Sequence, residues 1–357
     1  MSFFTDYEKH VSEREKEGVP PLALNAKQTS EVCELIKLAS KSSCDEKAQS
    51  ELKFLISLLE TRINPGVDDA AKIKAEFLGE VIDGLAVSGL DAMRAIKILG
   101  KMLGGYNVEI LVRALKNSDE NIARAAANEL KNIILVHEYF DEIVKLASSN
   151  KFAKDVLASW ANAEWFTHKK PIETCINAVV FKVPGETNTD DLSPASEAYT
   201  RADIPLHAKA MLVKKMPDGL EILKELKTRG KKVAYVGDVV GTGSSRKSGI
   251  NSIQWHLGDE IEGVPNKKTG GIVIGTTIAP IFFNTAEDSG ALPIVANVNE
   301  LEMGDEIEIY PFKGEIYKLI GSEKKLVANF KLSPNTLSDE IRAGGRIPLM
   351  IGRQVTK

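Results

Sequence analysis

The residue pattern changes its period near Lys169–Pro171, and this change limits the fold more than any single motif does. Upstream, from about Ala26 to Phe166, apolar residues recur at helical spacing, as expected for helices that bury one face. Downstream, short β-branched runs alternate with helical stretches and are separated by Gly and Pro. We therefore expect an all-α domain over residues 1–166 and a mixed α/β domain over residues 167–357.

The upstream domain is expected to consist of short helices divided by strong breakers. One helix ends before Asn64–Gly66, and Asp68 or Asp69 can cap the next helix. Further helices are expected at Ala92–Leu103, Val108–Leu115, Asn121–Val136, Phe140–Ala147 and Phe152–Trp165. Helix pairs of this length, with small residues in Ala123–Leu130 that permit close approach, favour a HEAT-like solenoid. An irregular helical bundle is the alternative.

The downstream domain combines strands with intervening helices. Strands are expected at Ala178–Val183, Val233–Val236, Ile272–Ile274, Leu292–Val295, Glu306–Tyr310 and Leu326–Phe330. Helices are expected at Leu206–Leu212, Leu220–Thr228 and Ser248–His256.

Composition and charge exclude several classes of protein. The formal net charge of −4 argues against a strongly basic nucleic-acid footprint. No stretch approaches the ~18 uncharged apolar residues of a membrane span, and no signal peptide is recognisable. The scattered Cys33, Cys44 and Cys175 form neither a disulfide framework nor a zinc site, so we expect reduced thiols in a cytoplasmic protein. The five histidines also lack metal-binding spacing, and no metal ligand is predicted in this chain.

A glycine-rich segment, GDVVGTGSSRKS at Gly237–Ser248, follows the apolar run Val233–Val236. It lacks the GxxxxGK[ST] spacing of a P-loop. Its glycine spacing superficially fits a dinucleotide-binding turn, but the preceding strand lies deep within its domain instead of opening a βαβ unit.

A third interpretation starts from the side chains that the glycines would present. Ser244 and Ser245 would lie at a helix N-terminus, where free amide groups and the helix dipole favour negative charge. Arg246 adds a planar group suited to a carboxylate. Such a loop can bind a polycarboxylate and stabilise an unusually acidic serine hydroxyl. From these residues alone, a simple helix cap with a solvated arginine is an equal alternative.

Four segments in order resemble the mobile "swivel" domain of the aconitase superfamily. They are GETNTDDLSPA (Gly185–Ala195), the loop Gly237–Ser248, IAPIFFNTAEDSGALPI (Ile278–Ile294) and EIRAGGRIPLMIGR (Glu340–Arg353). The helical domain placed first, with the swivel domain directly after it, resembles bacterial aconitase B. This resemblance covers essentially the whole chain and implies a HEAT-like solenoid followed by a β/β/α swivel domain.

The resemblance also implies an activity and its residues. The family interconverts citrate and isocitrate through cis-aconitate, so the chain is expected to be the N-terminal part of an aconitate hydratase that also takes 2-methylisocitrate. By match to the family loop, Ser244 is the catalytic base and also binds substrate. Ser245, Arg246 and Arg201 match substrate-binding positions. Lys247 and Ser248 depart from the Glu-His of other aconitases, just outside the contact positions.

Cofactor and partners follow from the same resemblance. The family's [4Fe-4S] cluster is ligated by domains that follow this region, so we expect no cluster and no activity in this chain alone. The resemblance also implies a homodimer formed through the helical domain and binding of mRNA by the cluster-free form, with no membrane association. A freestanding interaction or RNA-binding protein, or a small subunit of a split hydro-lyase, are the alternatives.

Overall fold

The computed structural model describes residues 3–41 and 46–357, so Cys44 lies outside the described residues. Two compact units divide the chain. The first comprises Met1–His168 with Glu262–Pro265 and Met350–Lys357, and the second comprises Lys169–Ile261 and Asn266–Leu349. The C-terminal residues thus group with the helical unit, whereas the sequence placed them in the second domain.

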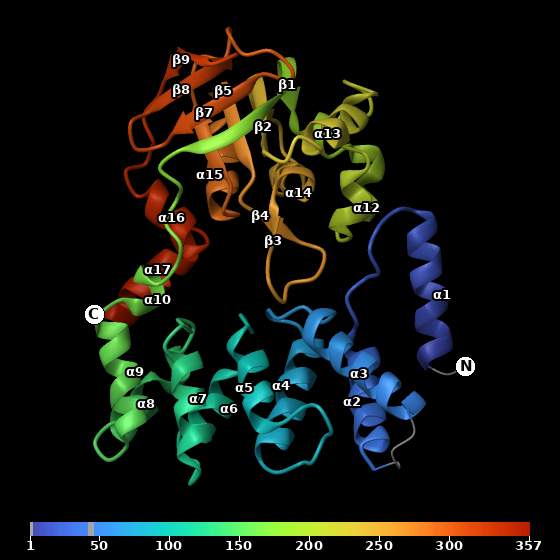
Figure 1. The fold of residues 1–357 in the computed structure, drawn as a ribbon, viewed down its shortest axis with the longest axis vertical. Helices are drawn as coiled ribbons and strands as arrows, with labels where there is room; N and C mark the ends of the chain where they lie inside the picture. Colours follow the sequence, from blue (N-terminus) through green and yellow to red (C-terminus); the bar gives the residue numbers. More distant parts are fainter. Residues whose placement is uncertain (1–2, 42–45) are drawn as a thin grey trace. The chain divides into compact units, whose positions relative to one another are not determined.

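The first unit is helical (Figure 1). Its elements are α1 (Phe3–Lys16), α2 (Ala26–Ala39), α3 (Glu46–Thr61), α4 (Asp69–Ile82), α5 (Ala92–Gly100), α6 (Val108–Ala114), α7 (Glu120–Leu130), η1 (His137–Tyr139), α8 (Phe140–Leu146), α9 (Lys151–Ala161) and α10 (Glu164–Thr167). α2 packs on both α3 and α4, and α4 packs on both α5 and α6.

Polar caps set several of the helix starts. Asp68 is the cap of α4, because its side chain accepts a hydrogen bond from the Ala70 amide, as the sequence indicated. Asp91 caps α5 in the same way, through the amide of Arg94. These caps satisfy amide groups that have no partner within the helix.

Several predicted helices end earlier than expected, and at two of them a tryptophan contact lies at the break. The helix predicted to reach Val136 ends at Leu130, where the Trp160 indole donates a hydrogen bond to the Leu130 carbonyl at 3.2 Å. The helix predicted at Phe152–Trp165 is interrupted by Ala163, which has a left-handed backbone (φ 54°). This break lets the Trp165 indole donate to Thr356 Oγ1 at 2.9 Å. Tertiary contacts of tryptophan therefore override the helical periodicity at both places.

The second unit is built on a seven-stranded sheet in the order β6-β5-β2-β1-β7-β8-β9. The strands are β1 (Ile176–Asn188), β2 (Lys232–Thr242), β5 (Ile272–Ile278), β6 (Leu292–Val295), β7 (Glu306–Tyr310), β8 (Glu315–Ile320) and β9 (Glu323–Asn329). The four strands from β6 to β1 are parallel, and β7, β8 and β9 continue the sheet in antiparallel fashion. A separate short ribbon pairs β3 (Asp259–Glu260) with β4 (Lys268–Thr269).

Helices cover both faces of this sheet. The helical elements are α11 (Thr189–Leu192), η2 (Ala195–Thr200), α12 (Ile204–Ala208), α13 (Gly219–Lys227), α14 (Arg246–Leu257), α15 (Pro280–Asp288) and α16 (Leu337–Ala343). The last helix, α17 (Arg346–Thr356), begins in this unit and belongs to the first unit from Met350 onward. Alternation along β1 sends Val179 and Phe181 into one core and Ala178 and Val180 into the other. The unit is therefore a layered α/β domain, as the sequence pattern predicted.

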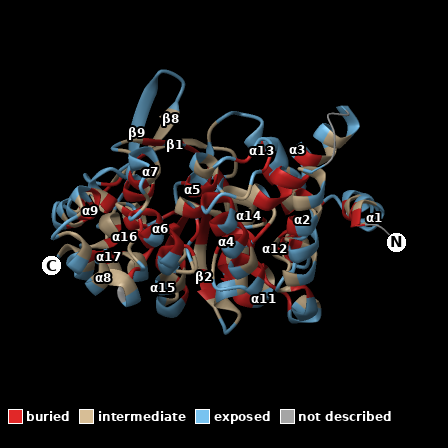
Figure 2. Ribbon diagram, turned by 90° about the horizontal axis from the view of Figure 1, so that it is seen from below, coloured by how far each residue is buried: buried red, intermediate tan, exposed pale blue. Residues whose placement is uncertain are grey.

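The sequence underestimated several of the strands. β8 was not predicted. β9 begins three residues before its predicted start, and the sequence missed these residues because they are charged and exposed (Figure 2). β1 continues past Pro184 through a shift in register between Val183 and Glu186. Asp238 stabilises this irregularity by accepting the Gly185 amide at 2.6 Å. β2 continues to Thr242, so half of the glycine-rich segment is strand.

A bilayer could not be crossed by any helix within the described ranges, since none has the required length and apolar character.

Two buried carboxyl groups join α15 to α16. Glu287 is 1% exposed and Glu340 is 4% exposed, and Thr336 Oγ1 donates to Glu340 Oε1 at 2.6 Å. Burial, followed by the hydrogen bond and charge of Glu340, raises the pKa of Glu287 to about 8, although Arg346 opposes the shift. Glu287 therefore keeps its proton at neutral pH.

Glu287→Gln should flatten the pH dependence of stability. Between pH 4.5, the ordinary value, and about 8, folded Glu287 holds a proton that the unfolded chain has lost. The free energy of unfolding then falls as pH rises, by up to about 1.4 kcal/mol per pH unit, and the amide removes this loss. Urea unfolding between pH 5 and 8.5 measures it, with exposed Glu323→Gln as the control. Equal slopes for wild type and Glu287→Gln would contradict the raised pKa of Glu287.

Candidate functional site

The turn from β2 into α14 holds the glycine-rich loop in a conformation that requires glycine twice. Gly241 has φ 83° and Gly243 has φ 103°. A Cβ at Gly241 would lie 2.1 Å from the ring of Phe282 on α15, and one at Gly243 would lie 2.6 Å from Thr189 Oγ1 on α11. The loop is thus held between two of the other segments that resembled the aconitase family.

The two serines occupy different environments. Ser244 is exposed, and its hydroxyl has no hydrogen-bond partner among the described residues. Ser245 is half-buried directly before α14, where its amide donates to Thr189 Oγ1 at 3.1 Å. Neither serine caps the helix through its side chain, so the simple-cap alternative is not what the structure contains.

Arg201 is brought to the same turn from a distant part of the sequence. Its Nη2 donates to Ser245 Oγ at 2.8 Å, across 44 positions of the chain. Its Nε is buried and lacks a hydrogen-bond partner among the described residues. A buried, unpaired donor is costly, so this guanidinium is set up to receive a further acceptor.

Arg246 begins α14 and folds back on the loop. Its Nη1 donates to the Gly243 carbonyl at 3.0 Å, and the side chain is half-buried. One hydrogen bond uses a fraction of the donors of a guanidinium, and the others stay available to a ligand. The structure thus brings Arg201, Ser244, Ser245 and Arg246 to one turn.

A buried histidine holds the segment before Arg201. His207 is 3% exposed; its Nε2 lies 2.7 Å from Ser193 Oγ and its Nδ1 lies 2.8 Å from Thr200 Oγ1. Burial lowers the pKa of His207, which keeps the imidazole neutral. The neutral ring therefore ties α11 to the end of η2, immediately before Arg201.

The aspartates of α11 complete this scaffold. Asn188 and Asp191 form a reciprocal capping box, and Asp190 Oδ1 accepts the Ala195 amide at 2.6 Å. Thr189, Phe282 and His207 are positioning residues that sequence reasoning missed. The TDDLSPA and IFFN motifs contain two of them, but no local signal shows that they contact the loop.

The electrostatics of the turn favour an anion. The first amide groups of α14 have no side-chain cap, and two guanidinium groups lie beside them. Helix N-termini with free amides and adjacent arginines bind carboxylates and phosphates.

The described residues do not fit an iron–sulfur cluster. Such clusters are held by several cysteine thiolates. Cys33 is buried in the helical unit, and burial raises the pKa of its thiol to about 12, whereas Cys175 belongs to the second unit. Over residues 3–41 and 46–357, no three His, Cys, Asp or Glu side chains are grouped as metal ligands.

Protein-family models match both parts of the chain. The model described as "Aconitate B N-terminal domain" matches residues 6–166, and the one described as "Aconitate hydratase 2 N-terminus" matches residues 178–357.

Curated relatives agree with these models. An aconitate hydratase B of Helicobacter pylori is 55% identical over 355 residues, which cover 99% of this chain and 40% of the relative. The corresponding protein of Synechocystis is 52% identical, covering 98% of this chain and 39% of the relative. That of Escherichia coli is 47% identical, covering 98% and 41%. The chain thus spans about 40% of the length of the curated relatives it matches.

Gly243→Ala should destabilise the second unit more than Gly321→Ala does. Both glycines have positive φ, but an added Cβ meets Thr189 at position 243 and nothing within 4 Å at position 321. Backbone strain alone costs about 1–3 kcal/mol, and the clash adds to it at Gly243 only. Urea unfolding measures both losses. Equal destabilisation would mean that the loop is not held against Thr189.

Proposed function

Because the chain belongs to the aconitate hydratase B family and matches its N-terminal portion, we propose that it supplies substrate-binding and proton-transfer groups to an aconitate hydratase. The reaction is the interconversion of citrate and isocitrate through cis-aconitate, and 2-methylisocitrate is a further proposed substrate. The observation that carries this proposal is the contact of Arg201 with Ser245 beside the uncapped start of α14.

Two arginines are proposed to bind substrate carboxylates. Arg201 offers its unpaired Nε, and Arg246 offers the guanidinium donors that Gly243 does not use. The Ser245 hydroxyl accepts a hydrogen bond from Arg201 and still has a proton to donate to a substrate. A substrate with several carboxylates can be held by such donors without an added cation.

Ser244 is proposed to be the catalytic base. Its hydroxyl is exposed and uncommitted, as a group that must approach the substrate has to be. As an alkoxide it would take the carbon-bound proton that is lost on dehydration to cis-aconitate, and it would return that proton on rehydration. Free amides at the start of α14 and the nearby Arg246 would stabilise the alkoxide, which is otherwise far too basic.

The cluster is proposed to belong to other parts of the enzyme, since the described residues of this chain do not fit it. Departure of the substrate hydroxyl is therefore assigned to groups outside this chain. The isolated chain is accordingly proposed to be inactive.

The helical unit is proposed to be a HEAT-like solenoid. Packing of α2 on α4, of α5 on α7 and of α7 on α9 supports a stack of helix layers. A homodimer through this unit and mRNA binding stay predictions that follow from the resemblance, and a cytoplasmic location stays a prediction from the cysteine pattern. The domain boundary between residues 166 and 167 likewise stays a proposal.

Ser244→Ala should abolish turnover in a chimera that joins this chain to the remaining portion of the Helicobacter pylori relative, which is 55% identical over the exchanged region. Loss of a general base lowers turnover by about 100-fold or more. The steady-state rate of cis-aconitate hydration measures this, with cluster content checked by absorbance.

Ser248→Ala, on the first turn of the same helix, is the matched control and should keep near wild-type turnover. A well-folded, cluster-loaded chimera without activity would contradict the proposed function. Full turnover by Ser244→Ala would contradict the role of Ser244.

A further inference from the structure

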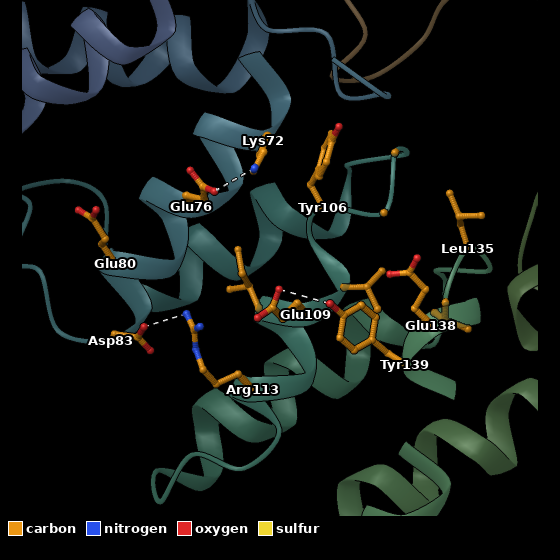
Figure 3. A pocket seen from close by; sticks show the side chains of 15 residues that line it. Lys72, Glu76, Glu80, Asp83, Tyr106, Glu109, Arg113, Leu135, Glu138 and Tyr139 are labelled. Atoms are coloured by element: carbon orange, nitrogen blue, oxygen red, sulfur yellow. Dashed lines mark hydrogen bonds and ion pairs between the residues drawn. The ribbon is translucent and has the colours of Figure 1, made fainter. Parts of the chain in front are cut away.

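The helical unit contains a groove that the proposed reaction does not use. It has a volume of about 780 Å³ and lies among α4, α6, the segment before α6 and residues 135–139 (Figure 3). Five carboxylates and two cationic side chains line it, so its formal charge is −3. Each of these residues belongs to the helical unit.

One wall carries acidic residues at one per helical turn. Glu76, Glu80 and Asp83 follow one another along α4 and its C-terminus, and their side chains are 52–63% exposed. Asp83 pairs with Arg113 at 2.8 Å, and Glu80 pairs with Lys37 at 2.8 Å. Glu76 lies 4.0 Å from Lys72, at the limit of an ion pair.

The other wall combines carboxylates with aromatic rings. Tyr139 donates to Glu109 Oε2 at 3.3 Å, and Glu138 lies beside them (Figure 3). Burial, with the neighbouring charges of Glu109 and Glu138, raises the pKa of Tyr139. Tyr106 also lines the groove.

The groove also offers apolar contact. Val108 and Val136 line it and are themselves almost fully buried, whereas Leu135 is 39% exposed at its edge. A groove with acidic walls and an apolar edge does not suit a small anion. It also differs from a docking surface that is apolar throughout.

We propose that this groove binds a protein segment in which Lys or Arg recurs at helical spacing with an apolar residue between. Carboxylates one turn apart on α4 are about 5–6 Å apart, which matches cationic side chains at i and i+4 of a partner helix. The two tyrosine rings add faces on which a cation can lie. Complementary charge of this kind increases the association rate and the selectivity for the partner.

The charge of the groove also argues against two other occupants. A nucleic acid brings one phosphate charge per nucleotide, which the net negative groove repels. A second copy of this chain has a formal net charge of −4, so it is not a generally basic partner. The experiment described next also detects binding of a nucleic acid or of a second copy of this chain.

The test uses a fluorescein-labelled peptide of about 14 residues with Lys at i, i+4, i+7 and i+11 and Leu between, titrated with the full chain by fluorescence anisotropy. The triple variant Glu76→Gln, Glu109→Gln, Glu138→Gln leaves the ion pairs of Glu80 and Asp83 intact. It should weaken binding at least about tenfold and lower its salt dependence.

The matched control removes three acidic charges elsewhere in the helical unit. Glu8→Gln, Glu31→Gln and Asp155→Asn are exposed positions on α1, α2 and α9, and this variant should change affinity by less than about twofold. If the groove triple does not fold, the single reversal Glu76→Lys on the exposed face of α4 should weaken binding several-fold.

Three results would overturn the proposal. One is equal affinity of the wild type and the groove triple, or equal loss in the control. Another is competition by a single-stranded RNA of similar length that the groove triple abolishes. The third is a change of the monomer–dimer equilibrium in the groove triple, measured by sedimentation, which would make the groove a contact between copies.

Discussion

The close contact of Gly241 with Phe282 is the constraint on which the candidate site depends. Phe282 is fully buried on α15, and the backbone of the loop can pass over its ring because no Cβ intervenes. In this position of the loop, Ser245 forms hydrogen bonds with Thr189 and Arg201, and Ser244 is exposed to solvent. Any side chain at position 241 would displace Ser244 and Ser245 together, since both follow in the same short turn.

Some of the polar groups around this turn have hydrogen-bond partners, and others do not. The aspartates of α11, the neutral His207 and the hydroxyl of Thr189 have their hydrogen bonds within the unit. Arg201 Nε, the Ser244 hydroxyl and the first amides of α14 do not, among the described residues. A rigid, fully bonded scaffold that presents a few unbonded donors is the arrangement that carboxylate recognition requires. The helical unit presents the opposite charge in its groove, so the two units differ in the ligands they suit.

Local patterns predicted the regular elements well where periodicity agreed with packing. β6 and β7 have the predicted bounds, because their apolar residues alternate cleanly or run together between turns. The end of α7 and the break at Ala163 were wrong, because contacts of Trp160 and Trp165 decide them. β8 lies between β7 and β9 and was missed although it contains Ile316, Tyr317, Leu319 and Ile320, because charged residues interrupt this short run.

In the candidate site, too, local sequence patterns predicted some features and missed those that depend on tertiary contacts. The glycine spacing indicated a loop that leads into a helix. The family resemblance added Arg201 to the candidate residues. The roles of Arg201 and of the two serines stay proposals. The bond from Arg201 to Ser245 joins positions 44 apart, and no spacing rule reports such a contact. The supports from Thr189, Phe282 and His207 were equally invisible, because each acts through a tertiary contact.

Binding of tricarballylate, a tricarboxylate without a hydroxyl, to the ¹⁵N-labelled chain tests the central claim most directly. If Arg201, Arg246 and the start of α14 form a carboxylate site, the amide signals of residues 243–248 should shift on titration. Arg201→Gln should weaken that binding at least about tenfold, as loss of a charge-assisted hydrogen bond does, whereas exposed Arg124→Gln in the helical unit should not. Shifts confined to other regions, or equal affinity of wild type and Arg201→Gln, would contradict the account.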